Sequence, residues 1–174
     1  MTVVVADACP VILLAKLDRL SLIREVFPGS ILVPTSVRRE LLHDAILSEE
    51  LRRIQAFLKH CRVEAVRISS HSASALSLAD RHVLSLAKRH PQSLVLTDDR
   101  LVRRVALAEG LTVAGTLGVI IRASRSRILT QTEALQAVDK LVTQHQLRIS
   151  VSLYQEAIGQ IRTPRLASLP GSVA

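Results

Sequence analysis

Short apolar runs punctuate the chain and predict strands. The runs cover residues 3–7, 31–33, 63–68, 93–97 and 112–114. The run VVVAD at 3–7 and the run SLVLT at 93–97 are continuous rather than alternating, and both are rich in branched aliphatic residues. Continuous apolar strands of this length are typical of a parallel sheet that is buried on both faces.

Between these runs, apolar residues recur every three or four positions, which indicates amphipathic helices. The first helix follows the run at 3–7 directly, because Pro10 suits a first helical turn, and it breaks near Asp18. The other predicted helices cover 20–27, 37–45, 47–60, 78–90, 99–109 and 117–124, and a helical pattern runs over 130–161. Alternating strands and helices predict an α/β fold with right-handed crossovers.

The pattern also sets the domain organisation. A chain of 174 residues with 48% hydrophobic residues predicts one domain. We expect this domain to span 1–161, with the helices in 130–161 as its C-terminal extension. Residues 162–174, RTPRLASLPGSVA, carry two prolines and little periodicity, so we expect a flexible tail there.

No apolar run approaches the roughly 18 residues that a membrane span needs, so we expect no membrane association. Residues 1–6 lack a basic leader and a long apolar segment, which makes the cytoplasm the expected location. Cys9 and Cys61 show no C-x-x-C spacing, so we interpret both as reduced thiols.

Charge points to an anionic partner. Lys and Arg together number 23 against 15 Asp and Glu, for a net charge of +8, and only four of the cations are Lys. Arg binds phosphate with two parallel donors, which favours RNA or DNA as the partner. The alternative is a basic surface without a ligand.

Acidic residues nevertheless follow two predicted strands. Asp7 ends the first strand, and Asp98 and Asp99 end the strand at 93–97. Ligands of parallel sheets bind beyond the carboxyl ends of the strands, and Glu40 and Asp80 are placed to join a site there. Clustered carboxylates repel one another unless a cation such as Mg²⁺ or Mn²⁺ lies between them, and such an ion activates water for phosphodiester hydrolysis.

Each acid also has a structural alternative. Asp7 and one of Asp98 and Asp99 have positions that cap the helices that follow them. Asp80 has capping-box spacing to Ser77, and Glu40 could be a surface charge on its helix. Their recurrence at equivalent ends of separate strand–helix units favours a shared site.

Four segments carry a family resemblance. In order, VVVADACPVILLAKLDRL, VPTSVRREL, LSLADRHVLSLA and LVLTDDRLVRRVA resemble the PIN-domain family of metal-dependent ribonucleases, which includes VapC-type toxins and ribosomal-RNA processing enzymes. The segments GLTVAGTLGVIIRA and LRISVSLYQEAI are similar to a bacterial and archaeal PIN subgroup catalogued as a domain of unknown function. The resemblance covers nearly all of residues 1–161.

The resemblance implies a three-layer α/β/α sandwich around a mostly parallel sheet, whose acids bind Mg²⁺ or Mn²⁺ and cleave RNA. The implied catalytic acids are Asp7, Glu40, Asp80 and Asp99. The implied metal ligands are Asp7, Asp80 and Asp99, with Asp98 as a neighbour that shares the role, and Thr97 orients the carboxylate of Asp99.

Arg100, Arg103 and Arg104 follow the acids directly and are candidate phosphate contacts, with a solvated helix face as the alternative.

Two motifs depart from the subgroup. Residues 7–10 read Asp-Ala-Cys-Pro where the subgroup usually has Asp-Thr-Ser-Pro, and 79–82 read Ala-Asp-Arg-His, with one acid where the subgroup often has two.

The sequence therefore predicts a divalent-metal-dependent endoribonuclease. If it is the toxin of a toxin–antitoxin pair, its partners are RNA and a small antitoxin protein, and helices 47–60 or 131–143 are candidate homodimer surfaces. The alternative is a catalytically degenerate PIN-like module that binds RNA or a protein. A phosphoacceptor receiver domain ranks low, because it needs a lysine at a late strand end and no lysine lies between residues 88 and 140.

Overall fold

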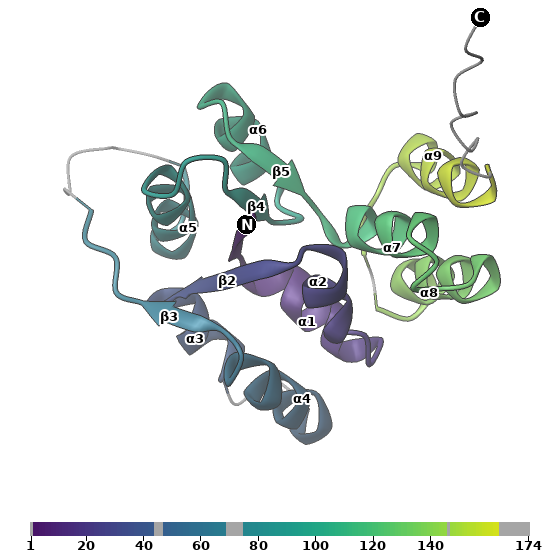
Figure 1. Ribbon diagram of the computed structural model, residues 1–174, viewed down its shortest axis with the longest axis horizontal. Coiled ribbons are helices and arrows are strands. Elements are labelled where there is room, and N and C mark those ends of the chain that lie inside the picture. The colour runs from purple at the N-terminus through teal and green to yellow at the C-terminus, as the bar shows by residue number, and fades with distance from the viewer. Residues whose placement is uncertain (1, 44–46, 69–74, 146, 164–174) are drawn as a thin grey trace, which may run out of the picture.

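The apolar runs of the sequence form the strands of one sheet. The computed structural model describes residues 2–43, 47–68, 75–145 and 147–163. Its strands are β1 (Thr2–Ala6), β2 (Gly29–Pro34), β3 (Arg62–Glu64), β4 (Leu94–Leu96) and β5 (Thr112–Ala114). All neighbouring strands pair in parallel, in the order β3-β2-β1-β4-β5 (Figure 1). Val4, Val5 and Val95 are fully buried, as the continuous apolar runs predicted.

Helices cover this sheet. They are α1 (Ala8–Lys16), α2 (Ser21–Val26), α3 (Thr35–Leu41), α4 (Ser48–Leu58), α5 (Leu78–Lys88), α6 (Arg100–Ala108), α7 (Thr116–Arg125), α8 (Gln131–Thr143) and α9 (Val151–Arg162). Most lie within two residues of the predicted ranges. The predicted α/β fold with a parallel sheet between helices is confirmed.

The strand order reverses direction between β1 and β4. From β1 the chain moves outward through β2 to β3, and then α5 carries it back across the sheet to β4 and on to β5. Because parallel crossovers are right-handed, the helices of the two halves cover opposite faces of the sheet. Accordingly α5 packs on β1, β2 and β4, whereas α1 packs with α3, α4 and α7 (Figure 1).

One predicted strand is wrong in extent. The sequence predicted a strand over 63–68, but β3 ends at Glu64 and residues 65–68 have no regular structure. The register explains the early end, because Glu64 pairs with Pro34, the last residue of β2. Beyond that point β2 supplies no backbone partner for the edge strand. The helix predicted over 37–45 ends at Leu41, and residues 44–46 lie outside the described part.

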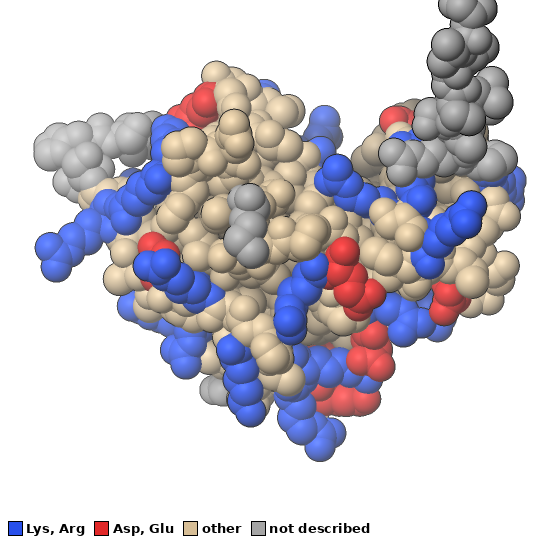
Figure 2. Space-filling view, in the orientation of Figure 1, with Lys and Arg blue, Asp and Glu red and all other residues tan. Residues whose placement is uncertain are grey.

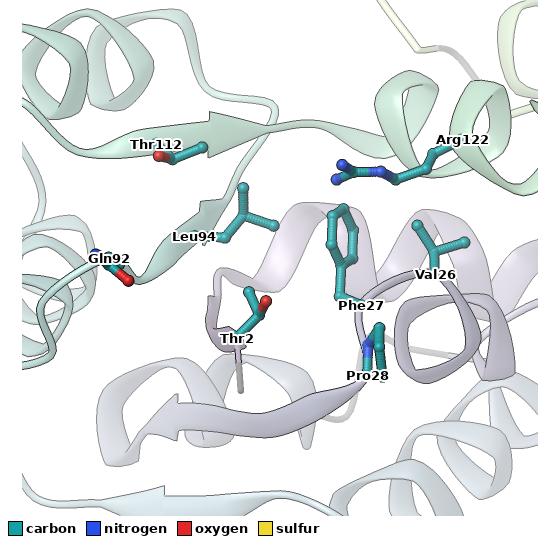
Figure 3. A pocket seen from close by; sticks show the side chains of 8 residues that line it. All are labelled: Thr2, Val26, Phe27, Pro28, Gln92, Leu94, Thr112 and Arg122. Carbon is teal, nitrogen blue, oxygen red and sulfur yellow. The ribbon is translucent and has the colours of Figure 1, made fainter. Parts of the chain in front are cut away.

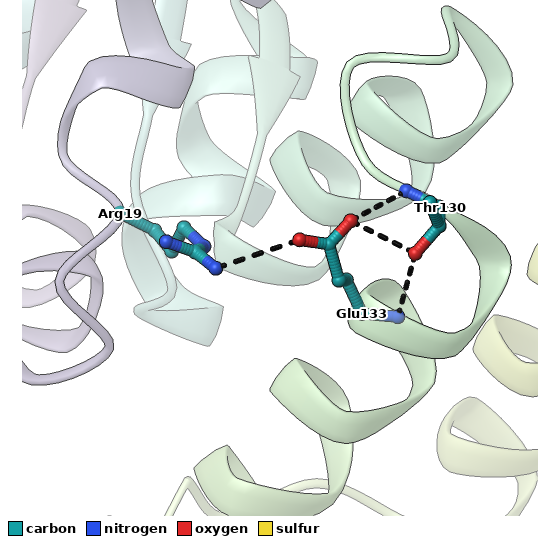
Figure 4. A network of polar contacts seen from close by, with 3 residues as sticks. All are labelled: Arg19, Thr130 and Glu133. Carbon is teal, nitrogen blue, oxygen red and sulfur yellow. Dashed lines mark hydrogen bonds and ion pairs between the residues drawn. The ribbon is translucent and has the colours of Figure 1, made fainter.

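The helical C-terminal extension packs on the rest of the chain. Helices α7, α8 and α9 contact one another, and α7 also contacts α1 and α2. A capping box opens α8: Thr130 Oγ1 accepts from Glu133 N at 3.2 Å, and Glu133 Oε2 accepts from Thr130 N at 2.9 Å. The second oxygen of Glu133 lies 3.7 Å from Arg19, which joins α8 to the turn between α1 and α2 (Figure 4). Thr130 first, and Arg19 in addition, lower the pKa of Glu133.

The C-terminal boundary and the predicted dimer surfaces can be compared with this packing. Helix α9 continues to Arg162, the first residue of the predicted tail, and residues 164–174 lie outside the described part. Four apolar residues of α8 are buried inside the chain, and so are Ile54 and Phe57 of α4; those of α8 are Ala134, Ala137, Val138 and Leu141. Both helices thus bury much of their apolar face within one molecule. Homodimerisation stays a prediction.

A cavity of about 350 Å³ lies at the amino ends of the strands. Thr2, Leu94 and Thr112, which begin β1, β4 and β5, line it together with Phe27 and Arg122 (Figure 3). The Arg122 guanidinium lies 5.0 Å from the centre of the Phe27 ring, in cation–π geometry. This end of the sheet is opposite to the one that carries the predicted acids.

Within the described residues, none of the helices has the length and apolar character needed to cross a bilayer.

Candidate active site

Asp7 and residues 97–99 lie at the point where the strand order reverses. Asp7 follows β1 and Thr97 follows β4, and these two strands are neighbours in the sheet. The backbone N–H of Asp7 donates to Leu96 O at 3.0 Å, which holds the two strand ends together. In open parallel sheets this switch point forms a crevice beyond the carboxyl ends of the strands, where ligands bind.

Asp7 is a buried acid, with 6% of its surface exposed. Its Oδ1 accepts from Ala8 N at 2.7 Å and thereby caps α1. Its Oδ2 accepts from Thr97 Oγ1, also at 2.7 Å. The capping role proposed as the structural alternative is therefore present, and it orients the carboxylate rather than removing it from the strand end.

Thr97 connects the two strand-end acids. It is fully buried, and its hydroxyl donates to Asp7 Oδ2 while accepting from Asp99 N at 3.2 Å. A hydroxyl can donate once and accept at the same time, so one side chain fixes Asp7 and the backbone of Asp99 together. Sequence analysis assigned Thr97 an orienting role toward Asp99; the structure adds the bond to Asp7.

Asp99 is the N-cap of α6. Its Oδ1 accepts from Leu101 N and Val102 N, both at 2.8 Å. Its Oδ2 has no hydrogen-bond donor among the described residues. Because the cap uses one oxygen, the other remains available to a ligand while α6 holds the side chain in place.

Asp80 has a similar arrangement at the start of α5. Its Oδ2 accepts from Ser77 N at 2.9 Å, and Ser77 Oγ accepts from Asp80 N at 3.1 Å. This is the capping box that the spacing of Ser77 and Asp80 predicted. Oδ1 of Asp80 has no donor within the described part of the chain, so this carboxylate, too, keeps one oxygen for a ligand.

Four acids share one electrostatic environment. Burial raises the pKa of Asp7 above its ordinary value, and the negative charges of Asp80 and Asp99 raise it further, against the hydrogen bonds that lower it. Burial also raises the pKa of Glu40 on α3, and the charges of Asp7 and Asp80 add to that effect. Because a like charge acts on a pKa at short range, Asp7 lies near Asp80 and Asp99, and Glu40 lies near Asp7 and Asp80; we call these four residues the acidic cluster.

Asp98 is held in a different environment. Its Oδ1 accepts from Thr116 N at 2.8 Å and its Oδ2 from Thr116 Oγ1, so both oxygens are directed to the start of α7. Burial raises the pKa of Asp98, and the bonds from Thr116 and the charge of Arg103 lower it; none of the other acids contributes. Asp98 as a metal ligand therefore stays a prediction, and the contacts give it a role in joining β4 to α7.

Gly115 makes room for this contact. A Cβ atom at position 115 would lie 2.5 Å from Asp98 Oδ1 and 3.3 Å from Thr97 O. Since Thr116 holds the Asp98 carboxylate in place, the clash has no easy relief. The sequence alone contained no signal that Gly115 packs against Asp98.

The substitution Gly115→Ala is expected to lower the free energy of unfolding by about 1–3 kcal/mol, the usual cost of overpacking. Gly159→Ala is the matched control, because a Cβ at position 159 meets nothing within 4 Å in the middle of α9. There the change should raise stability by about 0.5–1 kcal/mol through helix propensity. Urea unfolding of both variants measures the contrast, and equal effects would show that Asp98 is free to move.

The three predicted phosphate contacts differ in their surroundings. Arg100 and Arg104 are exposed on α6. Arg103 is half-buried, and its Nη1 donates to Thr97 O at 3.2 Å. Arg103 therefore stabilises the end of β4 from inside, and all three contacts with RNA stay predictions.

The donor chemistry of the acidic cluster suits a hard divalent cation, because carboxylate oxygens are the ligands that Mg²⁺ and Mn²⁺ prefer. Within the described residues, however, no three His, Cys, Asp or Glu side chains converge closely enough to hold one ion. The caps explain this spacing, since each of Asp7, Asp80 and Asp99 gives at least one oxygen to backbone N–H groups. Mg²⁺ commonly binds through one or two carboxylates and several waters, which fits this partly open arrangement.

Two further side chains near the cluster were given no role by sequence analysis. Burial of the thiol, and then the charges of Asp98, Asp7 and Asp99, raise the pKa of Cys9 to about 12. The thiol is therefore neutral at pH 7, even though the residue as a whole is exposed to solvent. His82 Nδ1 lies 2.9 Å from Ser36 Oγ, a contact that joins α5, which carries Asp80, to α3, which carries Glu40.

The family model DUF3368, described as a PIN domain, matches residues 3–163. No curated protein sequence matches the chain significantly. Among solved structures, a domain of a functionally unknown protein from Methanocaldococcus jannaschii DSM 2661 is similar, with 22% identity and a TM-score of 0.46 over 66% of this chain and 91% of that one.

The match to a PIN-domain model identifies the chain as an α/β domain with a nuclease-type fold. The chain belongs to the DUF3368 family of PIN domains. PIN domains are generally nucleases that use divalent metal ions, and the resemblance stated from the sequence is confirmed at the level of the family.

Proposed function

We propose that the protein is a divalent-metal-dependent endoribonuclease that hydrolyses RNA phosphodiester bonds at the acidic cluster. The observation that carries this proposal is that the buried Asp7 at the switch point lies within electrostatic reach of Asp80 and Asp99, and that Glu40 lies within reach of Asp7 and Asp80. Burying and crowding carboxylates costs free energy. A bound cation at the switch point of the sheet would offset that cost.

Each acid has a distinct role in the proposal. Asp7, Asp80 and Asp99 would hold Mg²⁺ or Mn²⁺, which when bound polarises a phosphate and lowers the pKa of water. Glu40 is more exposed than Asp7, and it would hold the metal or orient the attacking water. Thr97 keeps the carboxylate of Asp7 in position through its hydrogen bond.

RNA is the proposed substrate because the surface is strongly basic. The net charge is +8, and Figure 2 shows Lys and Arg side chains projecting at many points around one face of the molecule, with Asp and Glu at fewer. Arg100 and Arg104 are the exposed cations next to the acids on α6 and would contact phosphates. We further propose a cytoplasmic toxin whose small antitoxin protein covers the acidic cluster; this step rests on the resemblance to VapC-type toxins.

The test is metal-dependent cleavage. Purified protein is incubated with 5′-labelled single-stranded and hairpin RNAs in Mg²⁺ or Mn²⁺, with and without EDTA. Internal cleavage products are expected only with the metal, and Asp99→Asn should lower the rate about 10²–10³-fold, as the loss of one electrostatic stabiliser does. Asp139→Asn, an exposed site on α8, is the matched control and should leave the rate unchanged. Cleavage that persists in EDTA contradicts the metal mechanism.

A second candidate is a catalytically degenerate PIN domain that binds RNA or a protein without cutting. The specific observation in its favour is that no three acids converge on one point within the described residues. The replacement of the subgroup's two hydroxyl residues by Ala8 and Cys9 agrees with it. This candidate predicts salt-dependent RNA binding without turnover in any divalent metal.

A further inference from the structure

A groove runs between α5 and α6 on the outer side of the acidic cluster. Its volume is about 570 Å³, within the range of small-ligand sites. Helix α5 contributes Arg81, Leu84, Ser85 and Lys88, which lie on one face of the helix at spacings of three and four. The remaining lining residues are Arg67, Ile68, Ala75, Leu76, Leu101, Val105 and Glu109.

The groove begins beside the acids. Arg81 follows Asp80 directly, and Leu101 stands two residues after Asp99, so one end of the groove adjoins the acidic cluster. Both helices start at the carboxyl edge of the sheet and lead away from it, in contact with each other (Figure 1). A polymer whose scissile phosphate lies at Asp80 and Asp99 therefore has this groove as a path for its next residue.

The lining combines an apolar floor with cations. Leu84 is buried, and Leu101 and Val105 are half-buried. Lys88 is paired with Glu109, which leaves Arg67 and Arg81 as the cations whose charge no acid in the described part neutralises by an ion pair. The end of the groove beside Asp80, where Arg81 lies, thus favours an anion next to an apolar or flat group.

Arg81 supplies the independent sign of a ligand. Its Nε atom is buried and has no hydrogen-bond partner among the described residues. A buried N–H of a charged group without an acceptor costs free energy, and native structures rarely keep one without a reason. Because Arg81 also lines the groove, an anionic group there would pair with the charge of its guanidinium.

We infer that the α5–α6 groove binds one nucleotide of the RNA next to the cleavage point, with its phosphate against Arg81 and its base against Leu84, Leu101 and Val105. The inference rests on the proposed function and deepens it, because it identifies where the substrate is positioned. Charge complementarity favours a nucleotide over an apolar partner helix, which would leave the charge of Arg81 without an ion pair. The groove would set the affinity for RNA, while the acidic cluster sets the rate of hydrolysis.

The test separates binding from cleavage. Affinity for a fluorescein-labelled eight-nucleotide single-stranded RNA is measured by anisotropy in Ca²⁺ with EDTA-treated protein, and cleavage is measured separately in Mn²⁺. Arg81→Gln removes the charge, and Ser85→Trp fills the groove from α5 without touching a charge. Each should weaken RNA binding about tenfold, which is roughly one charge-assisted hydrogen bond. Arg52→Gln, an exposed site on α4, makes the same charge change outside the groove and should alter the affinity less than twofold.

The outcomes distinguish the two proposals. RNA binding that depends on the groove without any cleavage supports the groove and contradicts the nuclease. Metal-dependent cleavage, together with RNA affinities of Arg81→Gln and Ser85→Trp that both equal that of Arg52→Gln, overturns the groove and supports the nuclease. No RNA binding by the wild type overturns the groove. Circular dichroism melting of each variant shows that a loss of affinity does not come from unfolding.

Discussion

Replacing Asp7 with asparagine is expected to lower RNA cleavage about 10²–10³-fold and, at the same time, to make the stability of the fold less dependent on pH. The loss of activity follows from removing the most buried carboxylate of the acidic cluster, with a magnitude like that of losing one electrostatic stabiliser. Asparagine can still accept from Ala8 N, so the cap of α1 survives the change.

The effect on stability follows from the direction of the pKa shift. The pKa of Asp7 is higher in the folded chain than in the unfolded chain, mainly because of burial. The folded state therefore binds more protons in the window above the unfolded value of about 3.9, and stability falls as pH rises through the folded pKa. At pH 7 the ionised Asp7 destabilises the metal-free protein, and asparagine removes that cost.

Thermal melting of metal-free protein between pH 4 and pH 8 measures this prediction. The wild type should lose stability with rising pH more steeply than Asp7→Asn. Adding Mn²⁺ at about 100 times its Kd should stabilise the wild type by about 2.7 kcal/mol and the variant much less. A variant that melts well below the wild type at pH 7 would show that the hydrogen bond from Thr97 to Asp7 outweighs the cost of burying the charge.

Thr97→Val is expected to give the largest loss of stability of a single change near the site. Valine has nearly the same shape but no hydroxyl, so Asp7 Oδ2 loses its donor and Asp99 N loses its acceptor. Each buried polar group left without a partner costs about 1–3 kcal/mol. Urea unfolding should show a decrease of this size.

The same change should also affect catalysis, through the position and the pKa of Asp7. The bond from Thr97 lowers the pKa of Asp7, so its loss raises that pKa further. Loss of an orienting partner of this kind costs about 10–100-fold in activity, and the acidic limb of the pH–rate profile should move to higher pH. Thr97→Ser keeps the hydroxyl and should retain the wild-type profile. An unchanged profile in Thr97→Val would contradict the orienting role.

The positions of several acids of the site could be predicted from the sequence, because these acids directly follow predicted strands or open a predicted helix. A continuous apolar run predicts a strand from composition alone, and the residue after it lies at the carboxyl edge of a parallel sheet. Asp7 and Asp99 were assigned to that edge on this basis, and the capping box of Ser77 and Asp80 was predicted from spacing. These inferences are local, since they depend on a few neighbouring residues.

Long-range pairing decided the rest. Whether Asp7 and Asp99 are neighbours depends on β1 pairing with β4, and that pairing joins residues about 90 positions apart that no local pattern connects. The direction of adjacent carboxylates depends on what packs beside each: α6 amides hold Asp99 near Asp7, whereas Thr116 turns Asp98 toward α7. The length of β3 likewise depends on where its partner strand ends.

The sequence by itself thus determined the α/β class, the family, the strand-end acids and the cationic surface, because composition and short-range spacing encode them. Only the tertiary structure decided the strand order, the bond between Thr97 and Asp7, the separation of Asp98 from the cluster and the groove beside Arg81. Burial and side-chain direction arise from contacts between distant segments, and those contacts exist only once the chain has folded.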